Sequence, residues 1–194
     1  MITAIVLAAG QSKRMGQPKL ILPWGSSTVI RQVVNTLIQA ELDEILLVTG
    51  GAHQDVQAAL SDLPVHFLYN PIYAQSEMLV SLQLGLSILA ECVEAVLIVL
   101  GDQPQIQVEV VQAVIAAYHL TKPDLVVPSF HMHRGHPWLV ARAVWLPIRN
   151  LSPQDTLRNF LNSYHQRIHY LEVNTASILQ DLDTPNEYRH YSGK

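Results

Sequence analysis

The 194-residue chain contains little of what marks several common protein classes. It has one cysteine, Cys92, which excludes an internal disulfide bond and a zinc site built from several cysteines. Only 14% of its residues are charged, and no apolar run approaches the ~18 residues that span a membrane. The net charge is −4, which argues against non-specific binding to nucleic acid. We therefore expect a cytoplasmic protein with no nucleic-acid or membrane partner.

What the chain does have is apolar residues, since 49% of it is hydrophobic, and this supports a sizeable buried core. The length predicts one domain, residues 1–194. Residues 2–7 are an apolar run typical of a buried strand, and residues 29–38 repeat apolar side chains at helical spacing. A second buried strand at 44–49 completes a strand–helix–strand unit, which implies a parallel, right-handed crossover. The sequence therefore predicts an α/β fold.

The same patterns predict the remaining elements. Strands are predicted at 65–69, 95–100, 125–128 and 167–173, with a strand pair within 129–142. Helices are predicted at 52–60, 79–89, 108–118 and 184–191. One more helix is predicted to begin at Ser152, because a cap residue is followed there by Pro153 and by an acid in the first turn.

The loop that follows the first strand has the composition of a phosphate-binding loop. Small residues open it and three cations follow with no acid among them: Ala8, Ala9, Gly10, Lys13, Arg14 and Lys19. Backbone N–H groups and clustered positive charge at the end of a strand attract phosphates, and Gly10 can take a positive φ at little cost. Five residues separate Gly10 from Gly16, which excludes a Walker A loop and the dinucleotide fingerprint. A plain basic surface loop is the alternative.

A carboxylate follows the apolar strand at 95–100, in the turn Gly101-Asp102-Gln103-Pro104. The carboxyl ends of parallel strands are where α/β sheets bind ligands. One or two carboxylates together with phosphate oxygens suit Mg²⁺. The alternative is that Asp102 caps the helix at 108–118.

These stretches resemble a known family. Leu7-Ala8-Ala9-Gly10-x-Ser12-x-Arg14-Met15-Gly16-x-x-Lys19 resembles the signature loop of nucleotidyltransferases that activate a phosphate with an NTP. More narrowly it resembles the molybdenum cofactor cytidylyltransferase group, because the guanylyl branch more often begins Leu-Ala-Gly-Gly. The resemblance implies one nucleotidyltransferase domain with a three-layer α/β/α, Rossmann-like and mostly parallel sheet of the nucleotide-diphospho-sugar transferase type.

The resemblance also implies a nucleotide site. Arg14 and Lys19 would stabilise the transferring phosphate, and Asp102 would hold Mg²⁺, so these three are the predicted catalytic residues. The predicted nucleotide-binding residues are Leu7, Ala8, Ala9, Gly10, Ser12, Arg14, Lys19, Gly50, Ser81 and Asp102. Ser81 is included because residues 70–82 resemble the family's second loop, in which Ser76 stands in place of the usual glycine.

The second metal ligand is expected from the ending Asp181-Leu182-Asp183-Thr184-Pro185, which resembles the family's Asp-x-Asp-Thr-Pro. We favour Asp183 and keep Asp181 as the alternative. Mn²⁺ could take the place of Mg²⁺. Asp-Thr-Pro is also an ordinary helix start, which would explain these residues without a metal.

The predicted acceptor site comprises Arg134, His136 and Arg158. Arg134-Gly135-His136-Pro137 resembles the family's Gly-His-Pro stretch on the acceptor side of the cleft. Near Arg158 only Asp155 and the arginine itself match the family's Gly-Asp-x-Gly-x-Arg. Alternating histidines at 131 and 133 could instead bind a transition metal, although polar outward positions on a half-buried strand explain them more simply.

The implied reaction is transfer of an NMP, CMP from CTP by preference, onto a phosphate of the molybdopterin cofactor, with release of pyrophosphate. Two alternatives stay open. One is transfer to another phosphorylated acceptor, such as a sugar phosphate or methylerythritol phosphate. The other is a nucleotide-binding chaperone for cofactor insertion without turnover. A transient contact with a molybdoenzyme or chaperone would also fit. The sequence does not reveal which base of the NTP is recognised, nor the oligomeric state.

Overall fold

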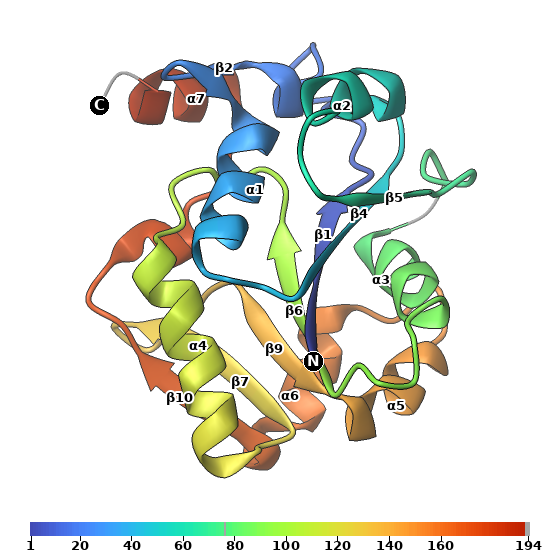
Figure 1. Ribbon diagram of the computed structural model, residues 1–194, viewed down its shortest axis with the longest axis vertical. Helices are drawn as coiled ribbons and strands as arrows, with labels where there is room; N and C mark the ends of the chain where they lie inside the picture. Colours follow the sequence, from blue (N-terminus) through green and yellow to red (C-terminus); the bar gives the residue numbers. More distant parts are fainter. Residues whose placement is uncertain (76, 193–194) are drawn as a thin grey trace.

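The computed structural model describes residues 1–75 and 77–192, which fold around one large sheet (Figure 1). Its strand order is β10-β7-β9-β6-β1-β4-β5, and β8 pairs with β7. The strands are β1 (Ile2–Ala8), β4 (Glu44–Thr49), β5 (His66–Tyr69), β6 (Ala95–Leu100), β7 (Leu125–Phe130), β8 (His133–Arg134), β9 (Trp138–Ala141) and β10 (Ile168–Glu172). Because β1 pairs in parallel with both β4 and β6, the predicted parallel crossover is confirmed.

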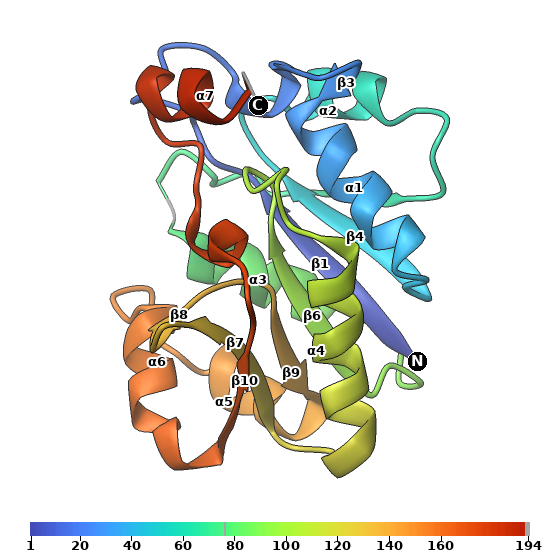
Figure 2. The same ribbon diagram turned by 90° about the vertical axis from the view of Figure 1, so that its left-hand side faces the viewer.

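Helices cover both faces of this sheet (Figure 2). The first face carries α1 (Val29–Gln39), α2 (His53–Ala59) and α4 (Val108–Thr121), and the second carries α3 (Met78–Ser87), α5 (Trp145–Arg149) and α6 (Leu157–Ser163). Side chains alternate along β1, so Ala4 and Val6 join the first core and Ile5 joins the second. The three-layer α/β/α arrangement predicted for the family is confirmed.

Two strands of the large sheet, β8 and β9, run antiparallel to their neighbours. They flank the turn at 135–137, but they do not pair with each other as predicted: β8 pairs with the end of β7, and β9 lies between β6 and β7, antiparallel to both. Trp138 Nε1 donates a 2.7 Å hydrogen bond to the carbonyl of Gly135 in the turn that leads into β9. The reversal places the turn at 135–137 at the edge of the sheet where β6 ends.

The helix predicted to begin at Ser152 begins later, which is a correction. Residues 152–155 form a closed turn, in which the Ser152 N–H donates to Asp155 Oδ2 at 2.8 Å. Helix α6 starts at Leu157, because Thr156 adopts the extended cap conformation and its side chain accepts from the N–H of Asn159. Both residues can cap, and the one directly before the apolar face does so.

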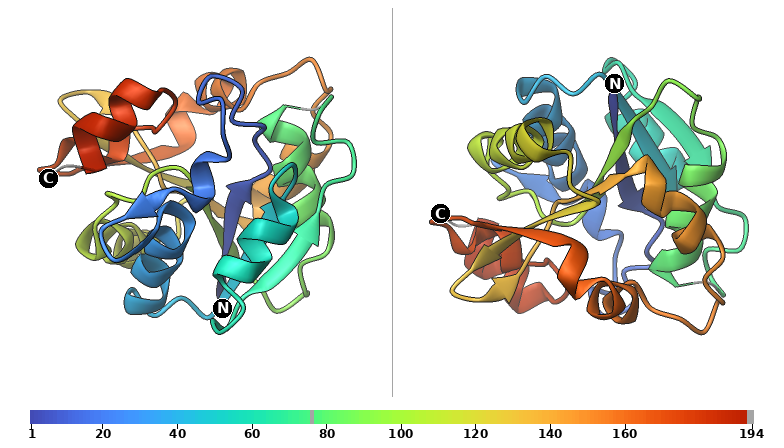
Figure 3. Two further views of the ribbon diagram at one scale, coloured as in Figure 1. Left: turned by 90° about the horizontal axis from the view of Figure 1, so that it is seen from above. Right: turned by 90° about the horizontal axis from the view of Figure 1, so that it is seen from below.

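The C-terminal helix packs against residues from the N-terminal part of the chain. Helix α7 (Pro185–Ser192) lies beside the small hairpin of β2 (Pro23–Trp24) and β3 (Ser27–Thr28), and Tyr188 donates a 2.6 Å hydrogen bond to the Pro23 carbonyl. Figure 1 shows α7 next to β2, and the left view of Figure 3 shows the same end of the molecule from above. Among the described residues, no helix is long and apolar enough to cross a membrane.

Candidate active site

The loop after β1 presents backbone donors to an open space. In the described part of the chain, the N–H groups of residues 10–13 have no hydrogen-bond partner. Ser12 takes a left-handed φ of 52°, and its carbonyl accepts from the N–H of Met15 at 3.0 Å and of Gly16 at 3.2 Å. Gly10 does not use its freedom to adopt a positive φ, and a Cβ placed on it would meet nothing within 4 Å. The glycine at this position therefore leaves space in which a ligand can approach the backbone, and it is not required by the backbone conformation.

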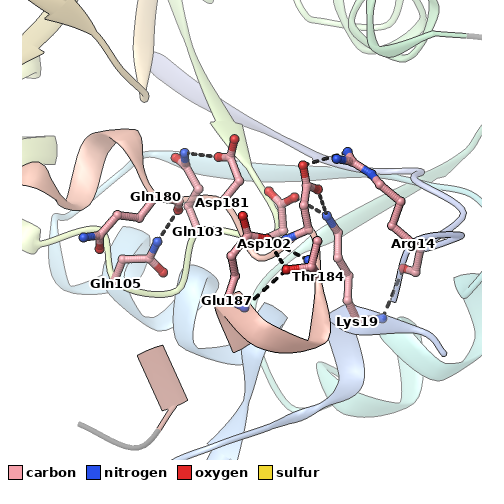
Figure 4. Close-up of polar contacts among 11 residues, drawn as sticks. Arg14, Lys19, Asp102, Gln103, Gln105, Gln180, Asp181, Thr184 and Glu187 are labelled. Atoms are coloured by element: carbon pink, nitrogen blue, oxygen red, sulfur yellow. Dashed lines mark hydrogen bonds and ion pairs between the residues drawn. The ribbon is translucent and has the colours of Figure 1, made fainter. Parts of the chain in front are cut away.

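Lys19 is the cation at the centre of the site (Figure 4). It begins the short helix η1 (Lys19–Ile21), and its backbone N–H donates to Ser12 Oγ at 3.1 Å. Its Nζ donates to Asp102 Oδ2 and, at 2.9 Å, to Asp183 Oδ1. Burial alone would lower the pKa of Lys19, but the two carboxylates outweigh burial and raise it. Lys19 is therefore charged.

Asp102 reaches this cation because β6 and β1 are neighbours. Leu7 is paired with Leu100, and the Gly101 N–H donates to the Leu7 carbonyl at 3.1 Å, so the turn after β6 lies against the loop after β1. The alternative that Asp102 caps α4 is wrong, since Gln107 holds the cap position there.

The C-terminal acids join the site through the backbone. The Leu182 N–H donates to the Asp102 carbonyl at 3.2 Å, which brings Asp181 and Asp183 beside Asp102. Asp183 also accepts from Arg14 Nη2 at 2.7 Å. Burial opposes ionisation of Asp183, but the hydrogen bonds and charges of Lys19 and Arg14 prevail and lower its pKa.

The helix start at Asp-Thr-Pro is also real. Thr184 Oγ1 accepts from the Glu187 N–H at 3.3 Å, and Glu187 Oε2 accepts from the Thr184 N–H at 2.7 Å, as in a capping box. Because Thr184 caps α7, the Asp183 carboxylate is left for Lys19 and Arg14. The two interpretations of this segment are compatible.

Asp181 is placed differently from Asp183. Its Oδ1 accepts from Nε2 of the buried Gln103 at 2.6 Å, and no cation pairs with it within the described residues. The side chain reaches solvent, yet the surrounding protein desolvates the carboxyl group and, with the Asp102 charge, raises its pKa.

The loop, the acids and α3 enclose a cleft of about 510 Å³. Nine of the ten predicted nucleotide-binding residues line it: Leu7, Ala8, Ala9, Gly10, Ser12, Arg14, Lys19, Ser81 and Asp102. Ser81 is buried, and its Oγ accepts from Asn70 Nδ2 at 3.0 Å. Gly50 is the exception. It lies behind the loop, where an added Cβ would be 2.5 Å from the Ala9 carbonyl oxygen and 2.7 Å from Tyr73 Cβ.

A second cavity of about 1020 Å³ adjoins this cleft, and Asp181 lines both. All three predicted acceptor residues, Arg134, His136 and Arg158, line the larger cavity. Arg134 is anchored by a 2.8 Å hydrogen bond to Asn162 Oδ1.

His136 contributes no charge to that cavity. Its ring stacks on Trp138 with centroids 4.2 Å apart, and its Nε2 is buried without a hydrogen-bond partner among the described residues. Desolvation by burial lowers the pKa of His136 to about 3. The imidazole is therefore neutral near pH 7, and the cationic groups of this wall are the arginines.

Among the lining residues that sequence reasoning missed, Tyr73, Glu77 and Gln103 have defined positions in the site. Tyr73 covers Gly50 and Gly51, with its Cε2 3.1 Å from the position of a Gly51 Cβ. Glu77 lines both cavities, and Gln103 holds Asp181. The Gly-Asp-Gln-Pro turn contained a signal for Gln103, whereas nothing local marked Tyr73 or Glu77. Ser76, where the family usually has glycine, lies outside the described residues.

No group of three or more His, Cys, Asp or Glu side chains arranged to hold a metal occurs in residues 1–75 and 77–192. The alternative of a metal on the histidines at 131 and 133 therefore finds no support there. A metal at Asp102 and Asp183 would need ligand oxygens from a bound molecule. The two carboxylates do converge on one cation, the Lys19 ammonium, so their placement fits a cation site.

Known proteins resemble this chain in sequence and in fold. Molybdenum cofactor cytidylyltransferase of Escherichia coli (strain K12) is 26% identical over 189 residues, covering 96% of this chain and 93% of that protein. Purine catabolism protein PucB of Bacillus subtilis (strain 168) is 28% identical, covering 96% of this chain and 94% of that protein. The crystal structure of Rv0371c from Mycobacterium tuberculosis H37Rv superposes with a TM-score of 0.87 at 26% identity, covering 100% of this chain and 97% of that one.

The sequence profile of one family matches most of the chain. The profile described as the MobA-like NTP transferase domain matches residues 4–168, which include the loop after β1, Asp102 and the predicted acceptor residues Arg134, His136 and Arg158. The chain therefore belongs to the MobA-like NTP transferase family, a family of nucleotidyltransferases.

Proposed function

We propose that the chain is a cytidylyltransferase that moves CMP from CTP onto a phosphate of the molybdopterin cofactor and releases pyrophosphate. One observation carries the proposal. A cation–carboxylate cluster lies at the carboxyl ends of adjacent strands, beside one cleft with free loop N–H groups and a larger cavity with two arginines. The Leu-Ala-Ala-Gly opening and the likeness to the E. coli cytidylyltransferase support the cytidylyl assignment.

The reaction makes modest demands on the protein. An oxygen of the acceptor phosphate bonds to the α-phosphorus of CTP, and the bond from that phosphorus to the bridging oxygen of the β-phosphate breaks. Positioning and charge neutralisation account for most of the catalysis in such transfers. The loop N–H groups would orient the triphosphate, and Arg14 and Lys19 would stabilise the charge that develops on it.

Asp102 and Asp183 would hold a divalent ion, Mg²⁺ by preference and Mn²⁺ as a substitute. Bound there, such an ion supplies electrostatic stabilisation of the phosphate oxygens. The carboxylate donors suit a hard cation. A structure of Rv0371c in complex with manganese, which superposes with a TM-score of 0.85 at 25% identity, supports divalent metal use in this fold.

The acceptor would occupy the larger cavity. Arg134 and Arg158 are exposed at its wall and would bind an anionic group, while the neutral His136 would offer a hydrogen bond. Because Asp181 and Glu77 line both cavities, an acceptor phosphate placed at their junction would face the nucleotide. Cytoplasmic location and a transient molybdoenzyme or chaperone partner remain part of the proposal.

Pyrophosphate release tests the assignment. We expect release with CTP and molybdopterin, and much less with the other three NTPs. Release with a sugar phosphate or methylerythritol phosphate instead of molybdopterin would favour another acceptor. CTP binding without release in any combination would favour the non-catalytic chaperone and overturn the proposal.

Variants test the site itself. Lys19→Ala and Asp102→Asn should fold normally and lose about 10²–10³-fold in turnover, the usual effect of removing one such stabilising group. The matched control is Asp55→Asn, which changes an exposed acid in α2, away from both cavities. Wild-type turnover in Lys19→Ala and Asp102→Asn would place the chemistry elsewhere.

A further inference from the structure

The Lys19 ammonium lies between the two carboxylates that the proposed function assigns to a divalent cation. It contacts Asp102 and Asp183 together, and the three side chains are only 13%, 16% and 29% exposed. A divalent ion bound by the same two carboxylates would be in direct contact with this ammonium. Like charges at that distance in a partly buried site repel strongly. The ammonium and the metal are therefore alternatives for one position.

The Lys19 side chain can leave this position while its backbone stays. The backbone N–H is fixed by Ser12 Oγ at the start of η1. The side chain is a flexible four-carbon stem that ends in a compact charge. It lines the same cleft as the unpartnered N–H groups of residues 10–13. A triphosphate bound to those groups would offer the ammonium new anionic partners within reach.

Arg14 takes part in the same exchange. Its guanidinium pairs with Asp183 at 2.7 Å, but the Arg14 side chain is 70% exposed. Exposed ion pairs contribute little, so phosphate oxygens displace them easily. Once Lys19 and Arg14 both turn to phosphate, Asp183 loses the two cations that occupy it.

We propose that Lys19 acts as an internal competitor of the divalent metal before nucleotide binds, so that nucleotide binding frees Asp102 and Asp183 for the metal. This inference rests on the proposed function for the identity of the cleft, and it adds an order of events. Without nucleotide the lysine blocks the metal. With nucleotide the lysine binds phosphate and the metal binds the carboxylates, so each ligand strengthens the other.

Direct measurement of Mn²⁺ affinity tests this, because free Mn²⁺ is detected by electron paramagnetic resonance without turnover. We expect weak binding to the wild-type protein alone, and at least tenfold tighter binding to Lys19→Met alone. Lys13→Met is the matched control. Lys13 belongs to the same loop and has the same charge, but it forms no salt bridge within the described residues, so its loss should leave Mn²⁺ affinity unchanged. Lys19→Met/Asp102→Asn should lose the added affinity, which locates the metal.

A second arm adds α,β-methylene-CTP, which cannot be turned over. The analogue should strengthen Mn²⁺ binding to wild type, beyond the affinity of the analogue itself for Mn²⁺, and should do so far less in Lys19→Met. Equal Mn²⁺ affinity of wild type and Lys19→Met in the absence of nucleotide would overturn the inference. Pyrophosphate release is scored separately. Metal competition without release would refute the proposed function alone, and release without competition would refute this inference alone.

Discussion

Replacing Gly50 by alanine should displace the loop after β1, because Gly50 packs directly behind that loop. An added Cβ would lie 2.5 Å from the Ala9 carbonyl oxygen and 2.7 Å from Tyr73 Cβ, and both distances are shorter than real Cβ contacts. The nearest atom belongs to the backbone of the loop, so relief requires the loop to move. Overpacking of this kind costs about 1–3 kcal/mol. At roughly 2–4 °C per kcal/mol for a chain of this size, the melting temperature should fall by roughly 2–12 °C.

Gly50→Ala should lose most of its turnover even at temperatures at which the protein remains folded. A shift of about 1 Å in groups that orient a substrate can lower the rate about 10²-fold. The assay combines thermal unfolding with pyrophosphate release under saturating CTP. Gly10→Ala is the matched control, because its Cβ meets nothing within 4 Å and its φ is not left-handed. It should keep the wild-type melting temperature and raise KM for CTP by about tenfold, since the methyl group enters the cleft. A Gly50→Ala protein with wild-type melting temperature and turnover would show that the loop does not depend on this contact.

Three further results are expected. His136 has a folded pKa of about 3 against about 6.5 when unfolded, so protons favour the unfolded chain as pH falls below 6.5. Stability should therefore fall by up to about 2 kcal/mol between pH 7 and 5. Denaturant unfolding at both pH values should show a smaller fall in His136→Gln, and an equal fall would refute the assignment. Asp183→Asn should weaken Mn²⁺ binding in the presence of nucleotide more than Asp181→Asn does, and the reverse order in a calorimetric titration would make Asp181 the second ligand. Thr156→Ala should cost about 1 kcal/mol of stability because it removes the α6 cap, whereas Ser152→Ala should cost less. Urea midpoints that rank these two variants the other way would contradict the cap placement.

Much of the fold was predictable from local patterns. The runs at 44–49 and 95–100 coincide with β4 and β6 to the residue, because β6 is buried along its whole length, β4 is buried at every position after Glu44, and turn residues bound both. The start of α6 was not predictable in the same way. Ser152 and Thr156 carry equivalent capping chemistry, and the choice between them depends on where Phe160 and Leu161 meet the core.

The candidate site was predictable where its residues follow strands directly. Lys19 and Asp102 could be placed together because neighbouring parallel strands end at one edge of the sheet. The lysine bridge between two acids could not be foreseen, since it depends on the Leu182–Asp102 backbone hydrogen bond between residues far apart in sequence. The position of Gly50 behind the loop could not be predicted either, because the sequence does not distinguish a glycine required for packing from one that contacts a ligand.

The strand β6 has neighbours of opposite direction, β1 on one side and β9 on the other. The loop after β1 lines the smaller cavity, the turn before β9 lines the larger one, and Leu100 at the end of β6 lines both. Under the proposed function, substitutions in the turn before β9 would change acceptor binding and leave the nucleotide cleft intact. The turn before β9 could therefore be exchanged, in evolution or by design, provided that the end of β6 is unchanged.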